Sequence, residues 1–215
     1  MLDRLVWIDC EMTGLDLSRD ALVEVAVVVT DSELALVDDG LDLVITTAED
    51  ALAGMPDVVR EMHTASGLLD EIKTATLSMA DAEEQLLDYI RQFVPDAGKA
   101  PLCGNSVATD RAFLARDMPK LESHMHYRMI DVSSIKELAR RWYPRVYYNA
   151  PAKVGGHRAL ADIKESIDEL RYYRATVLVA PPGPDAERAT SIAASIAGPP
   201  QPPPADPVDG ASPTA

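Results

Sequence analysis

The first residues that could do chemistry are two carboxylates, Asp9 and Glu11, which directly follow the apolar run 5–8. A β-rich run of this kind predicts a strand, and residues two apart on a strand point to the same face. Cys10, between them, is expected to point to the opposite face, into the core. An isolated pair of like charges on one face is most often a solvated strand end. The alternative is a site for a cation that both carboxylates bind.

Two further carboxylates, Asp110 and Asp162, each fall near the start of a predicted helix. Alone, each is explained by the favourable interaction of a negative charge with a helix N-terminus. Together with Asp9 and Glu11, they could form the oxygen-rich ligand set that Mg²⁺ and Mn²⁺ prefer. Two such ions, about 3.5 to 4 Å apart, stabilise both the attacking and the leaving oxygen when a phosphodiester is cleaved. The four carboxylates together therefore predict metal-assisted phosphodiester hydrolysis.

A histidine completes this group of residues. His157 precedes Asp162 by five residues, which would place the two side chains about 140° apart on one helix. Both can face one site only if His157 lies in the loop before the helix, where Gly155 and Gly156 supply a hinge. There the imidazole could take a proton from the attacking water as a general base. The alternative is a surface histidine at the start of a helix.

The elements that must position these residues are predicted to form an α/β fold. Three β-rich runs come first and suggest a three-strand meander: 5–8, 23–30 and 41–45. Helices then alternate with short strands at 101–104 and 127–131. The helices are expected at about 78–94, 107–118, 134–142 and 158–178, the first three capped by Ser78, by Asn105 with Ser106, and by Ser134. This order predicts a mixed β-sheet, a meander plus short strands, covered by helices.

Length and charge limit what the protein can bind. The 215 residues fit one domain, 1–180, and a tail, 181–215, which holds 10 of the 16 prolines and no aromatic residue and is predicted to be disordered. The net charge is −15; the tail contributes −3, so residues 1–180 carry −12. Because binding along a polyanion needs many basic contacts, this charge excludes a protein that coats long nucleic acid. A basic segment, 128–158, has seven Lys and Arg against two Asp and Glu, so it could hold one or two phosphates.

The sequence also indicates a compartment. No apolar run reaches the roughly 18 to 20 residues of a membrane span, and the N-terminus lacks the pattern of a secretion signal. The two cysteines, Cys10 and Cys103, fit a reducing environment. We therefore expect a cytoplasmic protein with no membrane partner.

Three segments resemble the motifs of the DEDDh 3′-to-5′ exonucleases, a family with an RNase H-like fold: Trp7–Leu15, Cys103–Ser106 with Asp110, and His157 with Asp162. Three more are similar to the oligoribonucleases within that family: His63–Leu68, His126–Arg128 and Asp131–Trp142. The resemblance runs from about residue 5 to residue 178. It implies an RNase H-like exonuclease domain over residues 1–180 and a homodimer that degrades RNA of two to a few nucleotides to mononucleotides from the 3′ end. Long duplex nucleic acid is not an expected partner.

The resemblance also implies roles for individual residues. Two divalent ions, Mg²⁺ or Mn²⁺, would be bound by Asp9, Glu11, Asp110 and Asp162, with His157 as the general base. The substrate-binding positions would be Leu15 as a wedge against the bases, His63 near the 3′ nucleotide, Ser106, Arg128 and Ser133 around the 5′ phosphate, and Tyr127 contributed across the dimer. One departure from the family is that Val58 stands where many relatives carry a tryptophan that stacks on the substrate.

Two other interpretations remain at this point. A DNA proofreading exonuclease or a tRNA-trimming relative would share the five catalytic positions but bind more of the substrate. A catalytically inactive nucleotide-binding module is the alternative from another class, and the presence of all five residue types argues against it. The sequence leaves open which metal is used, which dinucleotides are preferred and what the tail does.

Overall fold

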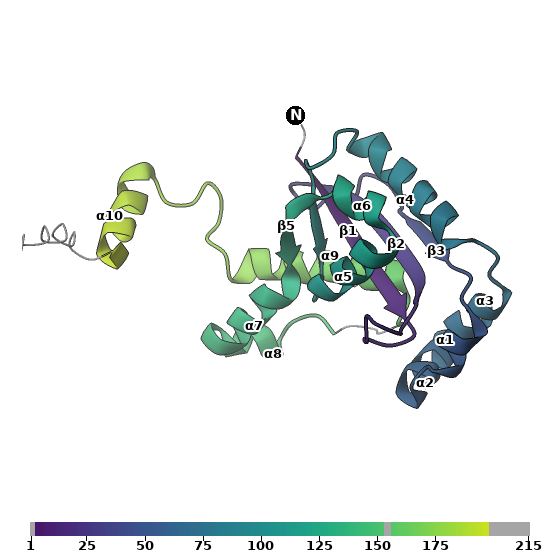
Figure 1. The fold of residues 1–215 in the computed structure, drawn as a ribbon. Helices are drawn as coiled ribbons and strands as arrows, with labels where there is room; N and C mark the ends of the chain where they lie inside the picture. Colours follow the sequence, from purple (N-terminus) through teal and green to yellow (C-terminus); the bar gives the residue numbers. More distant parts are fainter. Residues whose placement is uncertain (1–2, 153–155, 198–215) are drawn as a thin grey trace, which may run out of the picture. The chain divides into compact units, whose positions relative to one another are not determined.

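A computed structural model describes residues 3–152 and 156–197 of the chain (Figure 1). The strands of this part are β1 (Arg4–Met12), β2 (Leu22–Asp31), β3 (Leu41–Val44), β4 (Pro101–Gly104) and β5 (His126–Asp131). They form one sheet in the order β3-β2-β1-β4-β5. Strands β1, β2 and β3 pair antiparallel, whereas β4 is parallel to β1 and β5 is parallel to β4. The predicted mixed sheet with an N-terminal meander is therefore confirmed.

The helices lie between and after the strands. They are α1 (Glu49–Ala53), α2 (Asp57–Ala65), α3 (Leu68–Thr74), α4 (Met79–Phe93), α5 (Ala108–Asp117), α6 (Pro119–His124), α7 (Val132–Trp142), α8 (Pro144–Tyr148), α9 (Ala159–Thr176) and α10 (Ala186–Ala197). The four predicted helices correspond to α4, α5, α7 and α9. The others are short or lie in segments for which no element was predicted.

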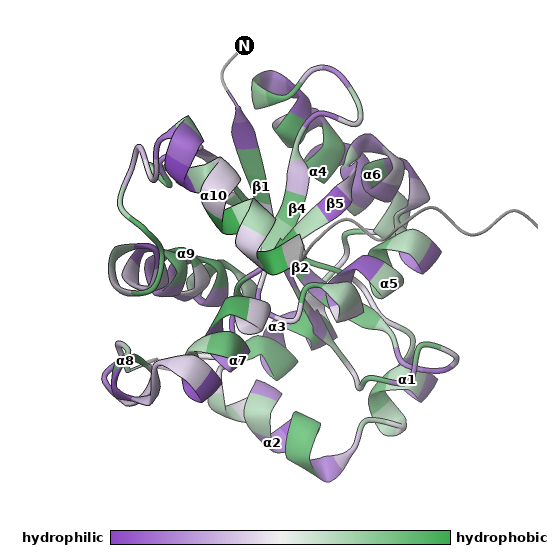
Figure 2. Cartoon of the chain, turned by 90° about the vertical axis from the view of Figure 1, so that its left-hand side faces the viewer, coloured by the Kyte–Doolittle hydropathy of each residue, from purple (hydrophilic) through white to green (hydrophobic). Residues whose placement is uncertain are grey.

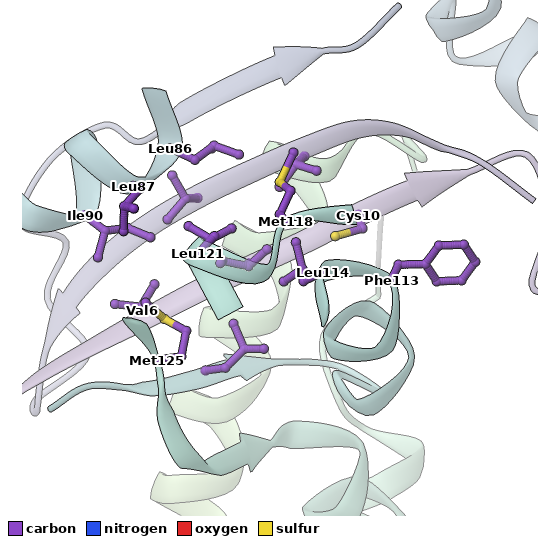
Figure 3. Close-up of a cluster of buried hydrophobic side chains, with 14 of the residues drawn as sticks. Val6, Cys10, Leu86, Leu87, Ile90, Phe113, Leu114, Met118, Leu121 and Met125 are labelled. Atoms are coloured by element: carbon purple, nitrogen blue, oxygen red, sulfur yellow. The ribbon is translucent and has the colours of Figure 1, made fainter. Parts of the chain in front are cut away.

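Strand β1 sends alternate side chains into two cores, one on each face of the sheet. Val6, Ile8 and Cys10 face a core that α4, α5 and α6 cover, and Figure 3 shows Val6 and Cys10 among side chains of these helices. Trp7 faces the other core, under α7 and α9. Each fully buried apolar side chain of this kind contributes roughly 1.5–3 kcal/mol. The alternation also decides that Asp9 points to the α9 side and Cys10 away from it.

Helix α9 closes the second face of the sheet. Its buried positions include Ile163, Ile167 and Tyr173, which pack against β1 and β2. Figure 2, which views α9 nearly along its axis, shows both hydrophobic and hydrophilic residues on this helix. Trp7 lies beneath it, fully buried, and its indole Nε1 donates a hydrogen bond of 3.0 Å to Thr30 Oγ1. The start of α9 is tied to β2 separately, because the Ala159 backbone N–H donates to Glu24 Oε2 at 3.1 Å.

Helix starts show where local sequence rules succeed and fail. Ser78 caps α4 as predicted, accepting a hydrogen bond from the Asp81 backbone N–H. The predictions for the next two caps are wrong. Helix α5 starts after Val107, with no side-chain cap among the described residues, because the Asn105 amide is engaged elsewhere. Helix α7 is capped by Asp131 instead of Ser134.

The chain divides into two units, Met1–Leu178 and Val179–Ala215. Within the segment predicted to be disordered, the structure describes helix α10, an alanine-rich stretch flanked by prolines. Alanine favours helix, whereas the prolines on either side confine it. The division into a folded domain and a tail stays a prediction, and residues 198–215 lie outside the described residues. Within the described ranges, no helix is both long and apolar enough to cross a membrane.

Candidate active site

An open cleft of about 520 Å³ lies where the carboxyl ends of the parallel strands β1 and β4 meet the starts of α5 and α9. Ligands of open α/β sheets commonly bind at such an edge. The lining residues are Asp9, Cys10, Glu11, Met12, Leu15, Asn105, Ser106, Thr109, Asp110, His157, Asp162, Glu165 and Ser166. All five predicted catalytic residues, together with Leu15 and Ser106, therefore line one cleft.

Four carboxylates converge in this cleft from three elements. We call Asp9, Glu11, Asp110 and Asp162 the carboxylate end of the cleft. Glu11 and Asp110 are buried, with 8% and 6% of their surface exposed. Asp110 reaches β1 from the first turn of α5, because its Oδ1 accepts a hydrogen bond of 3.0 Å from the Cys10 backbone N–H. This long-range bond fixes one carboxylate beside the strand that carries two others.

The loop before α9 brings His157 to the same place. Helix α9 begins at Ala159, so His157 lies outside the helix, as the spacing to Asp162 required. Its backbone has a φ of 47°, a left-handed conformation that is uncommon for a residue other than glycine. One ligand atom each of Glu11, His157 and Asp162 lies within 4.8 Å of the others. The hinge residue Gly155 lies outside the described residues.

Arg158, the residue after His157, anchors this loop to the sheet. Its Nε donates to Glu24 Oε1 at 2.8 Å, and its Nη1 lies 2.7 Å from Glu71 Oε1. Glu24 is fully buried on β2, directly opposite Glu11 in the β1–β2 register, and it also accepts from the Ala159 backbone N–H at 3.1 Å. The buried charge of Glu24 is thus satisfied by the start of α9.

The charges of the carboxylate end favour a cation. Burial, and then the neighbouring Glu24, Asp162 and Asp110 carboxylates, raise the pKa of Glu11 to about 8. Burial raises the pKa of Asp110 to about 6. Oxygen ligands crowded in this way, with an imidazole beside them, fit a hard divalent ion, because its charge would offset their mutual repulsion.

Leu15 stands on a braced loop at the mouth of the cleft. The loop links β1 to β2, and the Leu15 side chain is 76% exposed. Arg116 of α5 donates to the backbone carbonyls of Leu17 and of Asp20, the latter at 2.8 Å. The buried Asp20 carboxylate lies so close to Gly14 that any side chain there would collide with it. The exposed leucine is therefore held by a loop with little freedom.

Ser106 and Ser133, which we call the serine end of the cleft, lie next to each other. Their hydroxyl oxygens are 3.2 Å apart, and the Ser106 backbone N–H donates to Ser133 Oγ at 3.0 Å. The Asp131 carboxylate accepts from the backbone N–H groups of both serines, at 2.9 and 3.0 Å. The segment before α5 and the start of α7, 25 residues apart in the sequence, are thus joined at one carboxylate.

Four other residues named in the sequence analysis lie elsewhere. His63 of α2 is fully buried behind Glu11: its Nε2 is 2.9 Å from the Met12 carbonyl oxygen, and its Nδ1 is 4.0 Å from Glu11 Oε2. Tyr127 and Arg128 are exposed on the edge strand β5, with the guanidinium 5.4 Å from the ring centre. Val58 is 72% exposed on α2. Their roles toward a substrate stay predictions.

The basic segment 128–158 is not the free phosphate patch that its composition suggested. Arg140 and Arg141 both hydrogen-bond to Glu137 on the same helix. Lys136 pairs with the buried Glu169 at 3.0 Å. Arg158 is engaged by Glu24 and Glu71, as described above. Lys153 lies outside the described residues. Of the six described basic residues in this segment, four are therefore paired within the chain, and two of these four share the single Glu137 carboxylate.

The cleft also contains residues that the sequence analysis did not assign to the site, Thr109, Glu165 and Ser166, and one that it assigned wrongly to a helix cap, Asn105. Glu165 and Ser166 follow Asp162 by three and four residues, so helical spacing places all three on one face. That spacing was a usable signal. No local signal could have shown that Asn105 reaches Ser166.

Comparisons with known proteins define the class to which this fold belongs. The family model RNase_T, described as exonuclease, matches residues 6–170. Among solved structures, exonuclease I from Methylocaldum szegediense gives a TM-score of 0.59 at 20% identity, over 81% of this chain and 41% of that one. The zinc-bound E. coli exonuclease I–single-stranded DNA complex gives 0.64 at 13% identity, over 82% and 41%. These likenesses show the fold, and with the family match they define an exonuclease of RNase H-like fold, a class that uses divalent metal ions.

More similar sequences narrow this class. An oligoribonuclease from Streptomyces griseus is 65% identical over 202 residues, which cover 94% of this chain and 100% of the relative. Another, from Nocardia farcinica, is 61% identical over 199 residues, which cover 92% of each chain. The chain belongs to the oligoribonuclease family.

Proposed function

We propose that this chain is a 3′-to-5′ exoribonuclease that hydrolyses RNA of two to a few nucleotides to nucleoside 5′-monophosphates. One observation carries the proposal: Asp9, Glu11, Asp110, Asp162 and His157 line a single cleft, with Leu15 and Ser106 at its margins. The names of the similar proteins support a short RNA substrate.

The carboxylate end is proposed to hold two divalent ions, Mg²⁺ or Mn²⁺, through Asp9, Glu11, Asp110 and Asp162. When bound, these ions would stabilise negative charge on the attacking and leaving oxygens of the phosphodiester. Burial, and then the neighbouring Glu24, Asp162 and Asp110 carboxylates, raise the pKa of Glu11 to about 8, and a bound cation would offset this crowding of acidic groups, which supports this assignment. Supplying either ion alone to metal-depleted protein tests which of the two sustains turnover.

His157 is proposed as the general base. Its exposed position in the loop before α9 leaves the imidazole able to reach a water at the carboxylate end and take its proton. Arg158 restrains the same loop through Glu24, which supports a defined position for the imidazole.

Substrate length is proposed to be set at the two margins of the cleft. Leu15 would insert between or against the bases, because an exposed leucine on a braced loop offers an apolar surface at a fixed place. The serine end, Ser106 and Ser133, would bind the 5′ phosphate through hydroxyl groups, joined by Arg128, with Tyr127 supplied by the second copy. His63 would act near the 3′ nucleotide from behind Glu11.

A homodimer is part of this proposal. Support comes from β5, an edge strand that exposes 72% of Tyr127 and 41% of Met129. Unpaired strand edges with exposed apolar side chains commonly pair with another chain. Light scattering is expected to give twice the mass of one chain. A monomer at micromolar concentration with full activity would contradict the dimer.

The cytoplasm is the proposed location, because both cysteines, Cys10 and Cys103, are buried free thiols and short RNA is an intracellular product. Cell fractionation with an antibody against the chain tests this placement.

The deciding experiment compares a 5′-labelled two-nucleotide RNA with a 20-nucleotide single strand, each with and without a chelator. We expect faster turnover of the short RNA and no turnover with the chelator. Equal or faster cleavage of the long strand would contradict the preference for short RNA. A preference for long single-stranded DNA would instead favour a proofreading enzyme.

A further inference from the structure

Ser106 adopts a backbone conformation that needs support. Its φ is 52°, in the left-handed region that side chains other than glycine rarely occupy. Such a conformation costs free energy and persists only where the surrounding contacts enforce it. Here the Ser106 N–H donates to both the Asp131 carboxylate and the Ser133 hydroxyl oxygen. The place of the Ser106 hydroxyl therefore depends on where Ser133 is held.

Ser133 is held by Asn105, and Asn105 is held by a buried carboxylate. The Ser133 hydroxyl lies 3.0 Å from Asn105 Oδ1. The Asn105 amide Nδ2 donates to Glu169 Oε2 at 3.1 Å and to Ser166 Oγ at 2.8 Å. Glu169 is only 6% exposed and is paired with Lys136, so it is a carboxylate that can only accept hydrogen bonds. The Asn105 amide therefore directs its Nδ2 toward Glu169 and its Oδ1 toward Ser133.

Counting hydrogens then assigns a direction to each bond. A hydroxyl has one hydrogen, and Ser133 donates it to Asn105 Oδ1. In the 3.2 Å contact between the two serines, the donor must therefore be Ser106. Ser133 accepts from the Ser106 backbone N–H and from its hydroxyl. The exposed Ser106 hydroxyl is thus the group whose hydrogen can turn from Ser133 to an incoming anion.

We propose that Asn105 and Glu169 are positioning residues for the 5′ phosphate of the substrate: through Ser133 they orient Ser106 so that its hydroxyl donates to that phosphate. The inference rests on the proposed function. It assigns a role to Glu169, which is buried and is not one of the four carboxylates of the carboxylate end. It also assigns a role to Asn105, which the sequence analysis expected to cap α5. Neither residue needs to touch the reacting atoms.

The test compares two substrates on the full-length protein: a two-nucleotide RNA with a 5′ phosphate and the same RNA with a 5′ hydroxyl. The ratio of their kcat/KM values measures recognition of the phosphate, while the 5′-hydroxyl substrate alone reports on the chemistry. We expect a wild-type ratio well above one. In Asn105→Ala this ratio should fall about tenfold, as for the loss of one hydrogen bond to a charged group, with the 5′-hydroxyl rate kept within about threefold.

Two further variants sharpen the result. Glu169→Gln keeps an oxygen acceptor for the Asn105 amide but loses the charge, so its ratio should lie between those of wild type and Asn105→Ala. Asn149→Ala is the matched control, because the amide of this other asparagine donates to the Arg145 backbone carbonyl on the surface of α8. Its ratio should equal that of wild type. Thermal unfolding verifies that each variant is folded. If Asn105→Ala does not fold, Glu169→Gln tests the proposal in its place.

The outcomes separate the two proposals. If wild type releases no mononucleotide from either RNA, the proposed function fails. If wild type prefers the 5′ phosphate and Asn105→Ala keeps that preference, the function stands and the positioning role is overturned. An equal loss on both substrates would also overturn it, because it would mean that Asn105 supports the cleft as a whole.

Discussion

Ser106 lines one surface depression with the carboxylate end, and Ser133 lies beside Ser106, yet the carboxylate end and the serine end are built from opposite chemistry. At the carboxylate end, buried acidic groups accumulate until the pKa of Glu11 rises to about 8, which suits a cation that brings positive charge with it. At the serine end, the group on offer is the Ser106 hydroxyl, because the backbone N–H groups of both serines donate to Asp131, and the nearby Lys136 is paired with Glu169. The carboxylate end therefore attracts a cation, whereas the serine end presents uncharged hydrogen-bond donors at fixed positions.

This difference explains how an acidic protein can bind a substrate that is itself an anion. Neutral donors at fixed positions, with Arg128 as the single proposed basic contact, recognise one phosphate without creating an extended basic surface that would attract long strands. Bound divalent ions would supply the positive charge only where the bond is cleaved. Short RNA is then favoured, because an RNA of two or a few nucleotides can contact both the carboxylate end and the serine end.

Removing a carboxylate should have the largest effect. We expect Asp162→Ala to abolish Mn²⁺-dependent release of mononucleotides while the protein stays folded and dimeric. Asp168→Ala is the matched control, because this exposed residue of the same helix pairs only with Arg171 among the partners described for it. A product assay checks both variants, and unchanged release by Asp162→Ala would refute the metal-binding assignment.

His157→Ala should separate the base from the ions. A missing general base typically lowers the rate by about 10² to 10⁴-fold, so we expect kcat to fall within that range. Calorimetric titration of Mn²⁺ should give nearly the wild-type affinity. An equally large loss of affinity would show that the imidazole, whose ligand atom lies close to those of Glu11 and Asp162, is itself a metal ligand.

Arg116→Ala tests the loop that carries Leu15 at the mouth of the cleft. Without the two hydrogen bonds to the loop carbonyls, the loop must be ordered when substrate binds, so KM should rise about tenfold with kcat little changed. Arg91→Ala is the control, since its guanidinium pairs with Asp88 on the surface of α4. A fall in kcat with KM unchanged would mean that the loop acts in the chemical step.

The smallest effect should be that of salt. Single strands lose affinity with a logarithmic slope of about 0.7 per neutralised phosphate, so one or two phosphate contacts predict a slope of about 0.7 to 1.4. Binding of a two-nucleotide RNA, measured from 50 to 300 mM salt, checks this value. A slope several times steeper would mean that free basic residues, and not the serine end, hold the phosphate.

Sequence reasoning located the carboxylate end because its residues obey local rules. Asp9 and Glu11 alternate with Cys10 on a strand, and the spacing of His157 to Asp162 requires a loop followed by a helix; both features are present. The order of the elements likewise follows from periodicity. These features depend on neighbours in the chain, which a single sequence displays.

The serine end was recognised only in part, because its contacts span the sequence. Asn105 bonds to residues 61 and 64 positions away, so it resembled a helix cap until those partners were known. The basic charge of 128–158 looked available for the same reason: Arg158 has its partners 134 and 87 residues earlier. Helices α1 to α3 were missed because they are short, with five, nine and seven residues, so each offers only about one to three turns of pattern.

The alternation along β1 also constrains how this protein can change over evolutionary time. The odd-numbered side chains from Trp7 to Glu11 serve one face, while Cys10 and its even-numbered neighbours fill the core on the other. A substitution on this strand alters one contact, but the insertion or deletion of a single residue before Asp9 would exchange the two faces, burying acids and exposing aliphatic groups. We therefore expect the length of this strand to be the least variable feature of the catalytic domain, less tolerant of change than most of its individual residues.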